Sequence, residues 1–577
     1  MNSESESKRE VESSPDRDDA PGDHPDGVTE QLSPVPPKRV RNHLRRAIIA
    51  GAIGAGVIGL LQWFAPTTDH QIANMVSLLV GTLTVLVATW QLHGLAKQRG
   101  YRYRVPAAVA VIAIVLVTLL RFDGVSGEML PQFKYRFAKS PEMRVLAKDA
   151  PPNIAIESPP QALVAAIRAE ADSPGFLGTD RTGVIASRLF AVPSRASEVE
   201  TVWDQGIGQG WSSFSVVGDR AVTLEQREEL ECVTCYRLSD GELLWIVSHE
   251  ARHQNTLGGV GPRSTPTIVG ELVYAQGATG RVWCLDLQTG ETRWTVDLLE
   301  LAGWDKAASE LAITWGRSGS PLIVDDLCVV PFGGPDANAP TGRSLIALDV
   351  DNGMVRWTAG EDQISFASPG LMTLAGKRQI VSVNEKTISG HDVQDGNVLW
   401  DFQWLGLSNG NANCAMAIPA GKDRFLIGKG YGGGSALVEV QEQDDGSWIA
   451  QAVWDSPKVL KTKFTHACVD GDIAYAISNG SLEAVTVADG EQQWLQPRTS
   501  RFGQGQILLV EDAIVAQSES GEVALIAADP MEYRELLRLP AMNSKTWNIP
   551  TIAGRHLLVR NDRQAICFLL PPRTEKD

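Results

Sequence analysis

The sequence predicts an all-β fold, an eight-bladed β-propeller of four-stranded antiparallel blades, preceded by about three transmembrane α-helices. Three observations lead to this prediction. Segments that end in tryptophan recur through the C-terminal two-thirds of the chain, and strand-like runs precede each of them. Long apolar stretches lie N-terminal to the first repeat.

The tryptophan-ending segments align without gaps. The four full copies are CLDLQTGETRW, ALDVDNGMVRW, GHDVQDGNVLW and AVTVADGEQQW, which end at Trp294, Trp357, Trp400 and Trp494. A fifth copy, YRLSDGELLW, ends at Trp245. Each copy has alternating apolar and polar residues on both sides of an Asp-Gly, Thr-Gly or Asn-Gly turn, which is the pattern of an antiparallel hairpin. The copies recur every 40 to 63 residues, the period of a four-stranded propeller blade.

The ends of the repeat region predict how the ring closes. Two strand-like runs precede each hairpin, so one unit has about four strands and stacks on its neighbours. Seven units run from Trp211 to Leu539, and an eighth, IPTIAGRHLLVRNDRQAICFLLPP, stops after its third strand. VETVWDQ around Trp203 matches the outer strand around Trp400. We therefore expect the first strand to pair with the last, which removes an exposed edge.

The repeated motif A-x-D-x-x-(T/D/N)-G-x-x-x-W resembles the tryptophan-docking repeat of the PQQ-like β-propellers. That superfamily includes quinoprotein alcohol and glucose dehydrogenases and also the non-enzymatic outer-membrane assembly lipoprotein of the BamB type. The resemblance covers roughly residues 198–572. It implies that the tryptophans pack between adjacent blades as a structural girdle, which consists of Trp203, Trp245, Trp294, Trp357, Trp400, Trp454 and Trp494.

The predicted domains follow from composition. Residues 1–40 are an acidic tail rich in Ser, Glu, Asp and Pro, which we expect to be disordered. Residues 41–122 form a membrane anchor with apolar stretches at 47–65, 72–90 and 105–121. The first two reach the length of a bilayer core of ~30 Å, and the third is marginal. Residues 123–197 are expected to be a linker, and residues 198–573 the propeller.

Basic residues predict the orientation of the anchor. They cluster before the first apolar stretch and between the second and third, whereas the loop around Asp69 contains neither Lys nor Arg. The positive-inside rule then places the N-terminus in the cytoplasm, and three spans put the propeller on the periplasmic side of a bacterial inner membrane. If the third stretch only lay on the membrane surface, the propeller would be cytoplasmic.

Two short motifs raise the question of metal or redox chemistry. Cys232 and Cys235 form a C-x-x-C, but residues three apart on a strand point to opposite faces, and the sequence has no second C-x-x-C. Residues 249–253 read H-E-x-x-H, which binds zinc when a helix places both histidines on one face. Here the motif follows a strand and runs into a Gly-rich loop. We therefore expect no metal site and interpret the second motif as an interblade loop.

Candidate binding residues lie where each inner strand begins, because these positions ring the mouth of the central channel. Basic and aromatic residues recur there. In a chain of net charge −17, such a basic cluster favours an anionic ligand or an acidic segment. The alternative is that these side chains satisfy loop carbonyls or pair with acidic neighbours. The candidates for ligand or partner binding are Trp211, Arg263, Arg317, Asn413, Lys463, Arg501, Lys545 and Trp547.

Two classes of function remain. We favour a membrane-anchored, non-catalytic binding or assembly scaffold with an envelope protein partner, no cofactor, no catalytic residues and no nucleic acid. The alternative is a membrane-bound quinoprotein dehydrogenase of sugars or alcohols, which would need PQQ with calcium or magnesium. Against it, the blades average under 50 residues, and the sequence shows no vicinal Cys-Cys and no Asn/Asp/Glu cluster assignable to a calcium site.

Overall fold

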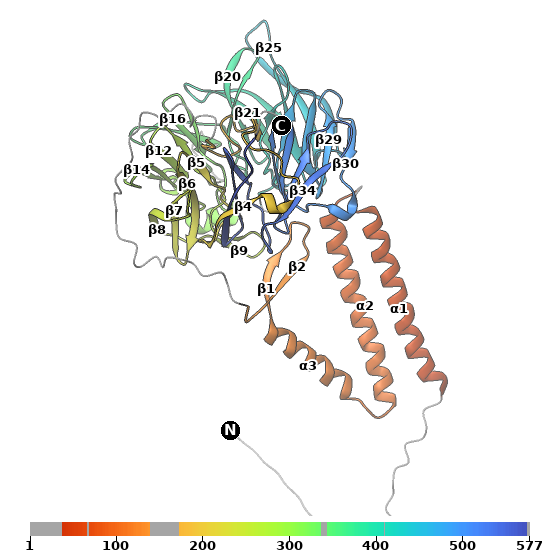
Figure 1. Ribbon diagram of the computed structural model, residues 1–577. Coiled ribbons are helices and arrows are strands. Elements are labelled where there is room, and N and C mark those ends of the chain that lie inside the picture. The colour runs from red at the N-terminus through yellow and green to blue at the C-terminus, as the bar shows by residue number, and fades with distance from the viewer. Residues whose placement is uncertain (1–36, 66–67, 139–171, 336–342, 409, 574–577) are drawn as a thin grey trace, which may run out of the picture.

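The computed structural model describes residues 37–65, 68–138, 172–335, 343–408 and 410–573. The predicted acidic tail, residues 1–40, lies outside the described residues up to residue 36. Eight sheets, seven of four strands and one with a fifth, surround a central channel, and three helices extend from one side of this ring (Figure 1). The predicted eight-bladed propeller is therefore confirmed.

Each of the first four blades is one antiparallel sheet whose strands follow in chain order, from the channel outward. Blade one contains β5 (Ser215–Val217), β6 (Arg220–Arg227), β7 (Leu230–Arg237) and β8 (Leu243–Glu250). Blade two contains β11 (Thr267–Val269), β12 (Leu272–Gln276), β13 (Arg281–Asp286) and β14 (Thr292–Asp297). Blade three contains β15 (Leu322–Val324), β16 (Leu327–Pro331), β17 (Leu345–Asp349) and β18 (Val355–Ala359). Blade four contains β19 (Gly370–Leu374), β20 (Lys377–Val383), β21 (Thr387–Asp392) and β22 (Val398–Gln403).

The next three blades repeat this order. Blade five contains β23 (Ile418–Pro419), β24 (Arg424–Lys429), β25 (Gly434–Glu442) and β26 (Trp448–Ser456). Blade six contains β27 (Ala467–Asp470), β28 (Ile473–Ser478), β29 (Ser481–Thr486) and β30 (Gln492–Leu495). Blade seven contains β31 (Gln506–Val510), β32 (Ala513–Gln517), β33 (Glu522–Ala527) and β34 (Glu535–Pro540). Short elements on the connections are η1 (Ala196–Glu198), β9 (Gln254–Asn255), β10 (Gly259–Val260), α5 (Leu298–Ala302), α6 (Lys306–Ala312) and η2 (Arg498–Ser500).

The eighth blade joins the two ends of the propeller. Its inner strands are β35 (Thr551–Ala553), β36 (His556–Arg560) and β37 (Gln564–Leu569), and its outer strand is β4 (Glu200–Gly206). β37 and β4 are antiparallel, with Cys567 opposite Trp203. The predicted closure is confirmed, and the core is divided among apolar clusters between neighbouring sheets.

The outer-strand tryptophans lie against the next blade. Trp294 in blade two donates its indole N–H to the Val350 carbonyl of blade three at 2.8 Å, and its ring lies over Gly353, whose φ of +74° forms the hairpin turn. Trp400 differs, because blade five lacks the short Gly hairpin; its ring stacks on Phe425 of blade five at 5.6 Å. The remaining tryptophans donate to a carbonyl of the following blade: Trp203, Trp245, Trp357, Trp454 and Trp494.

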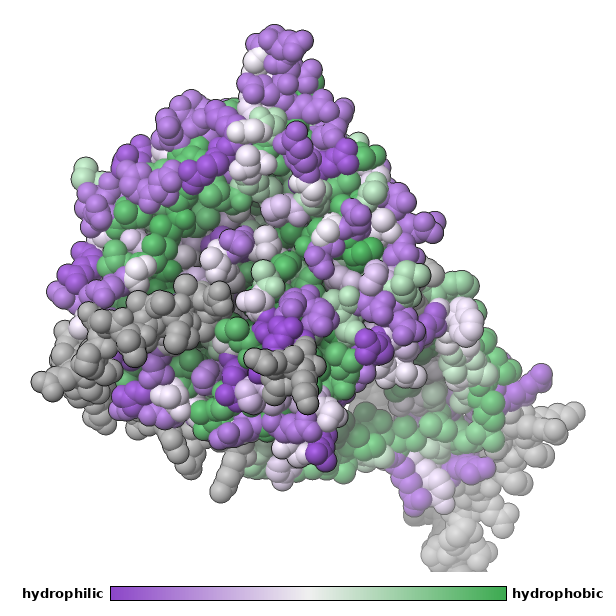
Figure 2. Space-filling view, turned by 45° about the horizontal axis from the view of Figure 1, so that its top comes forward, coloured by the Kyte–Doolittle hydropathy of each residue, from purple (hydrophilic) through white to green (hydrophobic). Residues whose placement is uncertain are grey.

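Three helices precede the propeller: α1 (Pro37–Phe64), α2 (His70–Gln98) and α3 (Arg104–Leu119). Figure 2 shows a broad hydrophobic surface along this helical part, whereas the propeller surface is mixed. Within the described residues, two helical segments are long and apolar enough to cross a membrane, Asn42–Phe64 and His70–Gln98. The prediction of a third span at 105–121 was wrong in its length, because the helix found there is shorter than the two segments that are long enough to cross a membrane. α3 ends at Leu119 because the chain turns into a strand there, and its 16 residues rise only about 24 Å.

The predicted linker contains structure that the sequence analysis missed. β1 (Leu120–Val125) and β2 (Pro131–Tyr135) form a hairpin directly after α3. β3 (Val184–Ile185) adds to the inner strand of blade seven in parallel orientation. Both segments lie at the channel, and they determine what the channel can admit.

The girdle makes a testable prediction at its glycines. Gly353→Ala would place a Cβ 2.8 Å from the Trp294 ring, whereas Gly376→Ala, at a similar φ of +78°, meets no atom within 4 Å. Both changes cost about 1–2 kcal/mol of backbone strain, and overpacking adds about 1–3 kcal/mol at Gly353 alone. Thermal unfolding of the purified protein should therefore show a larger loss for Gly353→Ala. Equal losses would contradict the docking of the tryptophan on this turn.

Candidate functional site

The channel has two ends, and segments N-terminal to the propeller lie across both. We call the end where the inner strands begin the mouth. Residues 68–75, at the start of α2, and residues 123–130, at the turn of the β1–β2 hairpin, cover it; together they are the mouth cap. At the opposite end, residues 172–185 run past the inner strands of several blades, since Ser173 pairs with Val216 and Val184 pairs with Leu509.

Buried charges hold the mouth cap in place. Lys463, which is 1% exposed, lies 3.2 Å from the Asp69 carboxylate, which is 6% exposed. Arg501 forms an ion pair with Glu128. Burial lowers the pKa of Lys463, and the neighbouring Asp69 carboxylate opposes that shift. Removing one partner of such a buried pair typically costs about 3–5 kcal/mol, so these contacts fix the cap firmly on the propeller.

Backbone groups of the cap are also bonded to the mouth. Lys545 donates to the Val125 carbonyl at 3.2 Å, and the Gly127 N–H donates to the Glu519 carboxylate. The backbone approaches so closely at Gly127 that a Cβ there would lie 2.4 Å from Gln504. At the start of α2, the His70 N–H donates to the Asn479 side chain at 3.2 Å. The cap is therefore built into the fold through both of its segments.

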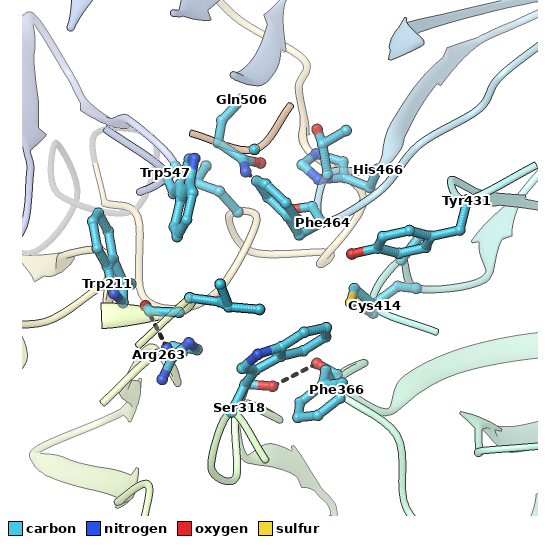
Figure 3. A pocket seen from close by; sticks show the side chains of 18 of the residues that line it. Trp211, Arg263, Ser318, Phe366, Cys414, Tyr431, Phe464, His466, Gln506 and Trp547 are labelled. Carbon is cyan, nitrogen blue, oxygen red and sulfur yellow. Dashed lines mark hydrogen bonds between the residues drawn. The ribbon is translucent and has the colours of Figure 1, made fainter. Parts of the chain in front are cut away.

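An aromatic chamber lies between the mouth cap and residues 172–185. It has a volume of about 310 Å³, and Figure 3 shows its labelled side chains arranged around a central space. Trp211 and Trp547 meet with ring centroids 4.9 Å apart, and Phe464 lies 5.1 Å from Trp547. Trp315 and Phe366 form a second pair at 5.1 Å. Met75 and Met129 of the cap, Phe176 from the opposite end and Tyr431 complete the apolar wall.

Arg263 is the basic side chain that reaches this chamber. Its guanidinium donates to the carbonyls of Gly258 at 2.6 Å and Gly261 at 3.2 Å. Within the described part of the chain, no carboxylate forms an ion pair with it. Burial lowers its pKa to about 10, so the side chain stays charged at neutral pH.

Several polar atoms in the chamber wall have no hydrogen-bond partner in the structure. Some of these atoms are donors and others are acceptors. Each belongs to a buried or half-buried residue that lines the chamber. These atoms are the indole nitrogen of Trp211, Oγ1 of Thr465, Nε2 of His466 and Oε1 of Gln506.

The structure separates the predicted mouth residues into three groups. Trp211, Arg263 and Trp547 line the chamber. Lys463, Arg501 and Lys545 contact the mouth cap, so the alternative interpretation, pairing with acidic neighbours and loop carbonyls, describes their observed contacts. The other two, Arg317 and Asn413, lie outside the chamber.

Arg317 and Asn413 do not reach the chamber. Arg317 is buried with its guanidinium 5.5 Å from the Trp304 ring, and burial lowers its pKa to about 10. Asn413 donates to the carbonyls of Asn384, Glu385 and Trp404, which fixes the connection after β22. Asn413 therefore holds a loop together, whereas the three guanidinium nitrogens of Arg317 lack a hydrogen-bond partner among the described residues. Sequence position alone could not show this, because strand starts do not reveal side-chain direction.

The two metal-like motifs are structural. His249 lies in β8 with its ring 5.1 Å from Trp283, and His253 is buried in the following loop. Burial lowers the pKa of His249 to about 4 and of His253 to about 3. Cys232 and Cys235 are free thiols whose pKa burial raises to about 12. Across the described residues, no group of three or more His, Cys, Asp or Glu side chains could hold a metal ion.

Comparisons with known proteins agree on one family. A family model described as outer membrane protein assembly factor BamB matches residues 196–362 and 231–496. The BamB protein of Burkholderia pseudomallei is 22% identical over 314 residues, which cover 53% of this chain and 72% of that protein. The BamB protein of Xanthomonas campestris pv. campestris is 22% identical over 355 residues, covering 46% of this chain and 82% of that protein.

Solved structures with a similar fold include both classes considered above. The crystal structure of BamB from Moraxella catarrhalis has a TM-score of 0.46 at 15% identity, covering 65% of this chain and 99% of that one. The quinohemoprotein alcohol dehydrogenase of Comamonas testosteroni has a TM-score of 0.48 at 11% identity, covering 71% and 82%.

The ion pair between Arg501 and Glu128 predicts the behaviour of a charge swap. Arg501→Glu sets two carboxylates against each other, so amide hydrogen exchange at residues 124–130 should accelerate. Combining it with Glu128→Arg should restore most of the protection, because opposite charges face each other again. Arg293→Glu, which disturbs an exposed pair with Asp286 on blade two, should leave the cap unchanged. A double variant as unprotected as the single one would contradict the role of this pair.

Proposed function

The chain belongs to the family of outer membrane protein assembly factor BamB, whose model matches more than half of its length, and we propose that it acts as a membrane-anchored, non-catalytic binding or assembly scaffold. Its propeller would face the periplasm and bind an envelope protein there. Two relatives are named as outer membrane protein assembly factors, which supports this class of function.

The mouth cap is the observation that carries the proposal. In a propeller, the mouth of the channel is the usual place for a small substrate to enter, but here buried ion pairs fix the chain's own segments over it. What stays open to a large partner is the outer rim. Exposed apolar side chains occur on the outer strands of four successive blades, and we propose that the partner binds along them. We call this the rim surface, and it contains Val355, Val398, Val453 and Leu495.

The path of the chain supports a periplasmic propeller. The loop between α1 and α2 lies on the propeller, since the Ala65 carbonyl accepts a hydrogen bond from Asn479. α2 then leads away, and its 29 residues rise about 43 Å. The chain returns through the 16-residue α3, which rises about 24 Å, and β1 leads from there to the mouth cap. An N-terminus in the cytoplasm would therefore put the propeller on the other side, with Arg104 and Arg121 snorkelling at the ends of the short α3.

The residues of the chamber do not fit the cofactor of the alternative function. PQQ is a tricarboxylate that binds together with a divalent cation, and such a cation takes carboxylate and carbonyl oxygen ligands. Among the described residues that line the chamber there is no Asp or Glu, and Arg263 is the one cation. We therefore derive no dehydrogenase mechanism for this chain.

Cross-linking in cells tests the scaffold function. A photo-activated cross-linking amino acid at Val355 or Val398 should give one discrete adduct with a protein partner, because both side chains lie on the rim surface. The same amino acid at Lys422, whose side chain is 92% exposed but lies outside the rim surface, should give none. Calorimetric titration with PQQ and Ca²⁺ should show no saturable binding. Micromolar binding with reduction of a dye by sugars or alcohols, in the absence of rim adducts, would overturn the proposal.

Reporter fusions test the orientation. Alkaline phosphatase needs disulfides that form in the periplasm, so it should be active when fused after residue 573 and inactive when fused after Gly100. A green fluorescent protein at the same two sites should give the opposite pattern. Phosphatase activity at both sites, or at Gly100 alone, would contradict the proposed topology.

A further inference from the structure

The chamber combines an unpaired cation with apolar walls. Arg263 donates to two backbone carbonyls, and a guanidinium has five N–H groups to offer. Arg263 is half-buried, and no carboxylate among the described residues pairs with its guanidinium. The neighbouring Cys414 thiol does not supply a counter-ion, because burial raises its pKa to about 12. The guanidinium can therefore donate further N–H groups to an anion that enters the chamber.

The charged groups around the chamber leave one cation without a counter-ion, which fits a ligand with a single negative charge. Lys463 and Arg501 face Asp69 and Glu128 of the cap, and Lys545 donates to a carbonyl and lies 4.2 Å from the Trp547 ring. His466 is neutral at physiological pH, because burial lowers its pKa to about 4. Its Nε2 atom and the indole nitrogen of Trp211 have no partner. The head group of a ligand would thus meet one cation and a few neutral polar atoms.

The rest of the chamber wall is largely apolar, so the part of a ligand beyond its head group must be apolar as well. Its wall consists mostly of aromatic rings together with Leu257, Met416 and the cap residues Met75 and Met129. A volume of about 310 Å³ lies at the lower end of the range for small-molecule sites. Gln71 and Met75 belong to the first two turns of α2, so the chamber lies beside the apolar helices that we propose to be membrane-embedded.

We propose that this chamber binds a single-chain amphiphile with a monoanionic head group, such as a fatty acid. The head group forms charge-assisted hydrogen bonds with Arg263, and the chain lies among the aromatic rings that Figure 3 shows. The chamber lies behind the mouth cap, on the side of the propeller that carries the helices (Figure 1). The lipid phase as the source of the ligand rests on the membrane anchor of the proposed function, whereas the binding itself rests on the residues of the chamber.

The test uses the full-length protein in nanodiscs of phosphatidylcholine, with 11-bromoundecanoate as the probe. Bromine quenches tryptophan fluorescence on contact, and Trp211, Trp315 and Trp547 line the chamber. The acid should quench in a saturable manner, above the linear background from partition into the bilayer. The uncharged 11-bromoundecanol should bind at least about tenfold more weakly, since it lacks the charge for the guanidinium. Acetate, which has the head group alone, should not compete.

Two variants identify the site. Arg263→Gln should weaken binding of the acid about tenfold or more and leave binding of the alcohol unchanged. Cys414→Phe, which fills the chamber from a side chain that points into it (Figure 3), should abolish the saturable phase for both probes. Arg281→Gln, at an arginine paired with Asp297 on blade two, is the matched control and should bind like the wild type.

The outcomes separate the proposal from its alternatives. Equal affinity of the wild type for acid and alcohol would overturn it, and so would an Arg263→Gln variant whose affinity for the acid stays within twofold. Calorimetric binding of a soluble aromatic acid such as indole-3-acetate, with no saturable signal from the bromo acid, would assign the site to a soluble anion instead. If Arg263→Gln does not fold, as judged by circular dichroism, Arg263→Lys replaces it and should retain the preference for acid over alcohol.

Discussion

A four-stranded blade has two apolar faces, and the need to cover both of them determines the remaining structure. Stacking the blades in a ring covers every face, provided that the ring closes. Closure is achieved by β4, which comes from the N-terminal side and completes the sheet of β37. Outer-strand tryptophans then fix five of the eight blades against the next blade, each through an indole hydrogen bond and a glycine turn. The closed ring leaves a channel, and the channel is where the other segments of the chain meet.

The cations at the mouth, Lys463 and Arg501, form buried ion pairs in a chain whose net charge is negative. Their partners come from residues 68–75 and 123–130, which lie several hundred positions away in sequence. Each pair is formed across the junction between helices and propeller, and so the pairs couple the position of the helices to the ring. A propeller that could rotate freely on its anchor would need exposed cations and a flexible connection. This one has buried pairs and a direct backbone contact at Gly127.

The sequence was sufficient for the blades and insufficient for the mouth, and the reason is physical. Hairpins leave a local pattern, because the Asp-Gly turn, the alternation and the docking tryptophan all lie within about a dozen residues. The β1–β2 hairpin leaves a weaker pattern, since Asp123-Gly124 and Ser126-Gly127 signal a turn but the hairpin directly follows an apolar helix and its second strand has five residues. Trp315 and Tyr431 also line the chamber. They lie on connections between the strands, so the positions of the strand starts did not reveal them. Arg317 stands at a strand start and yet points away from the chamber.

The pairing of β4 with β37 has a consequence for biosynthesis. β4 leaves the ribosome more than three hundred residues before β37, so the growing chain carries an unsatisfied sheet edge until β37 is made. A chain that stops short of Gln564 retains that edge, together with the open side of blade one, and such edges favour aggregation or degradation.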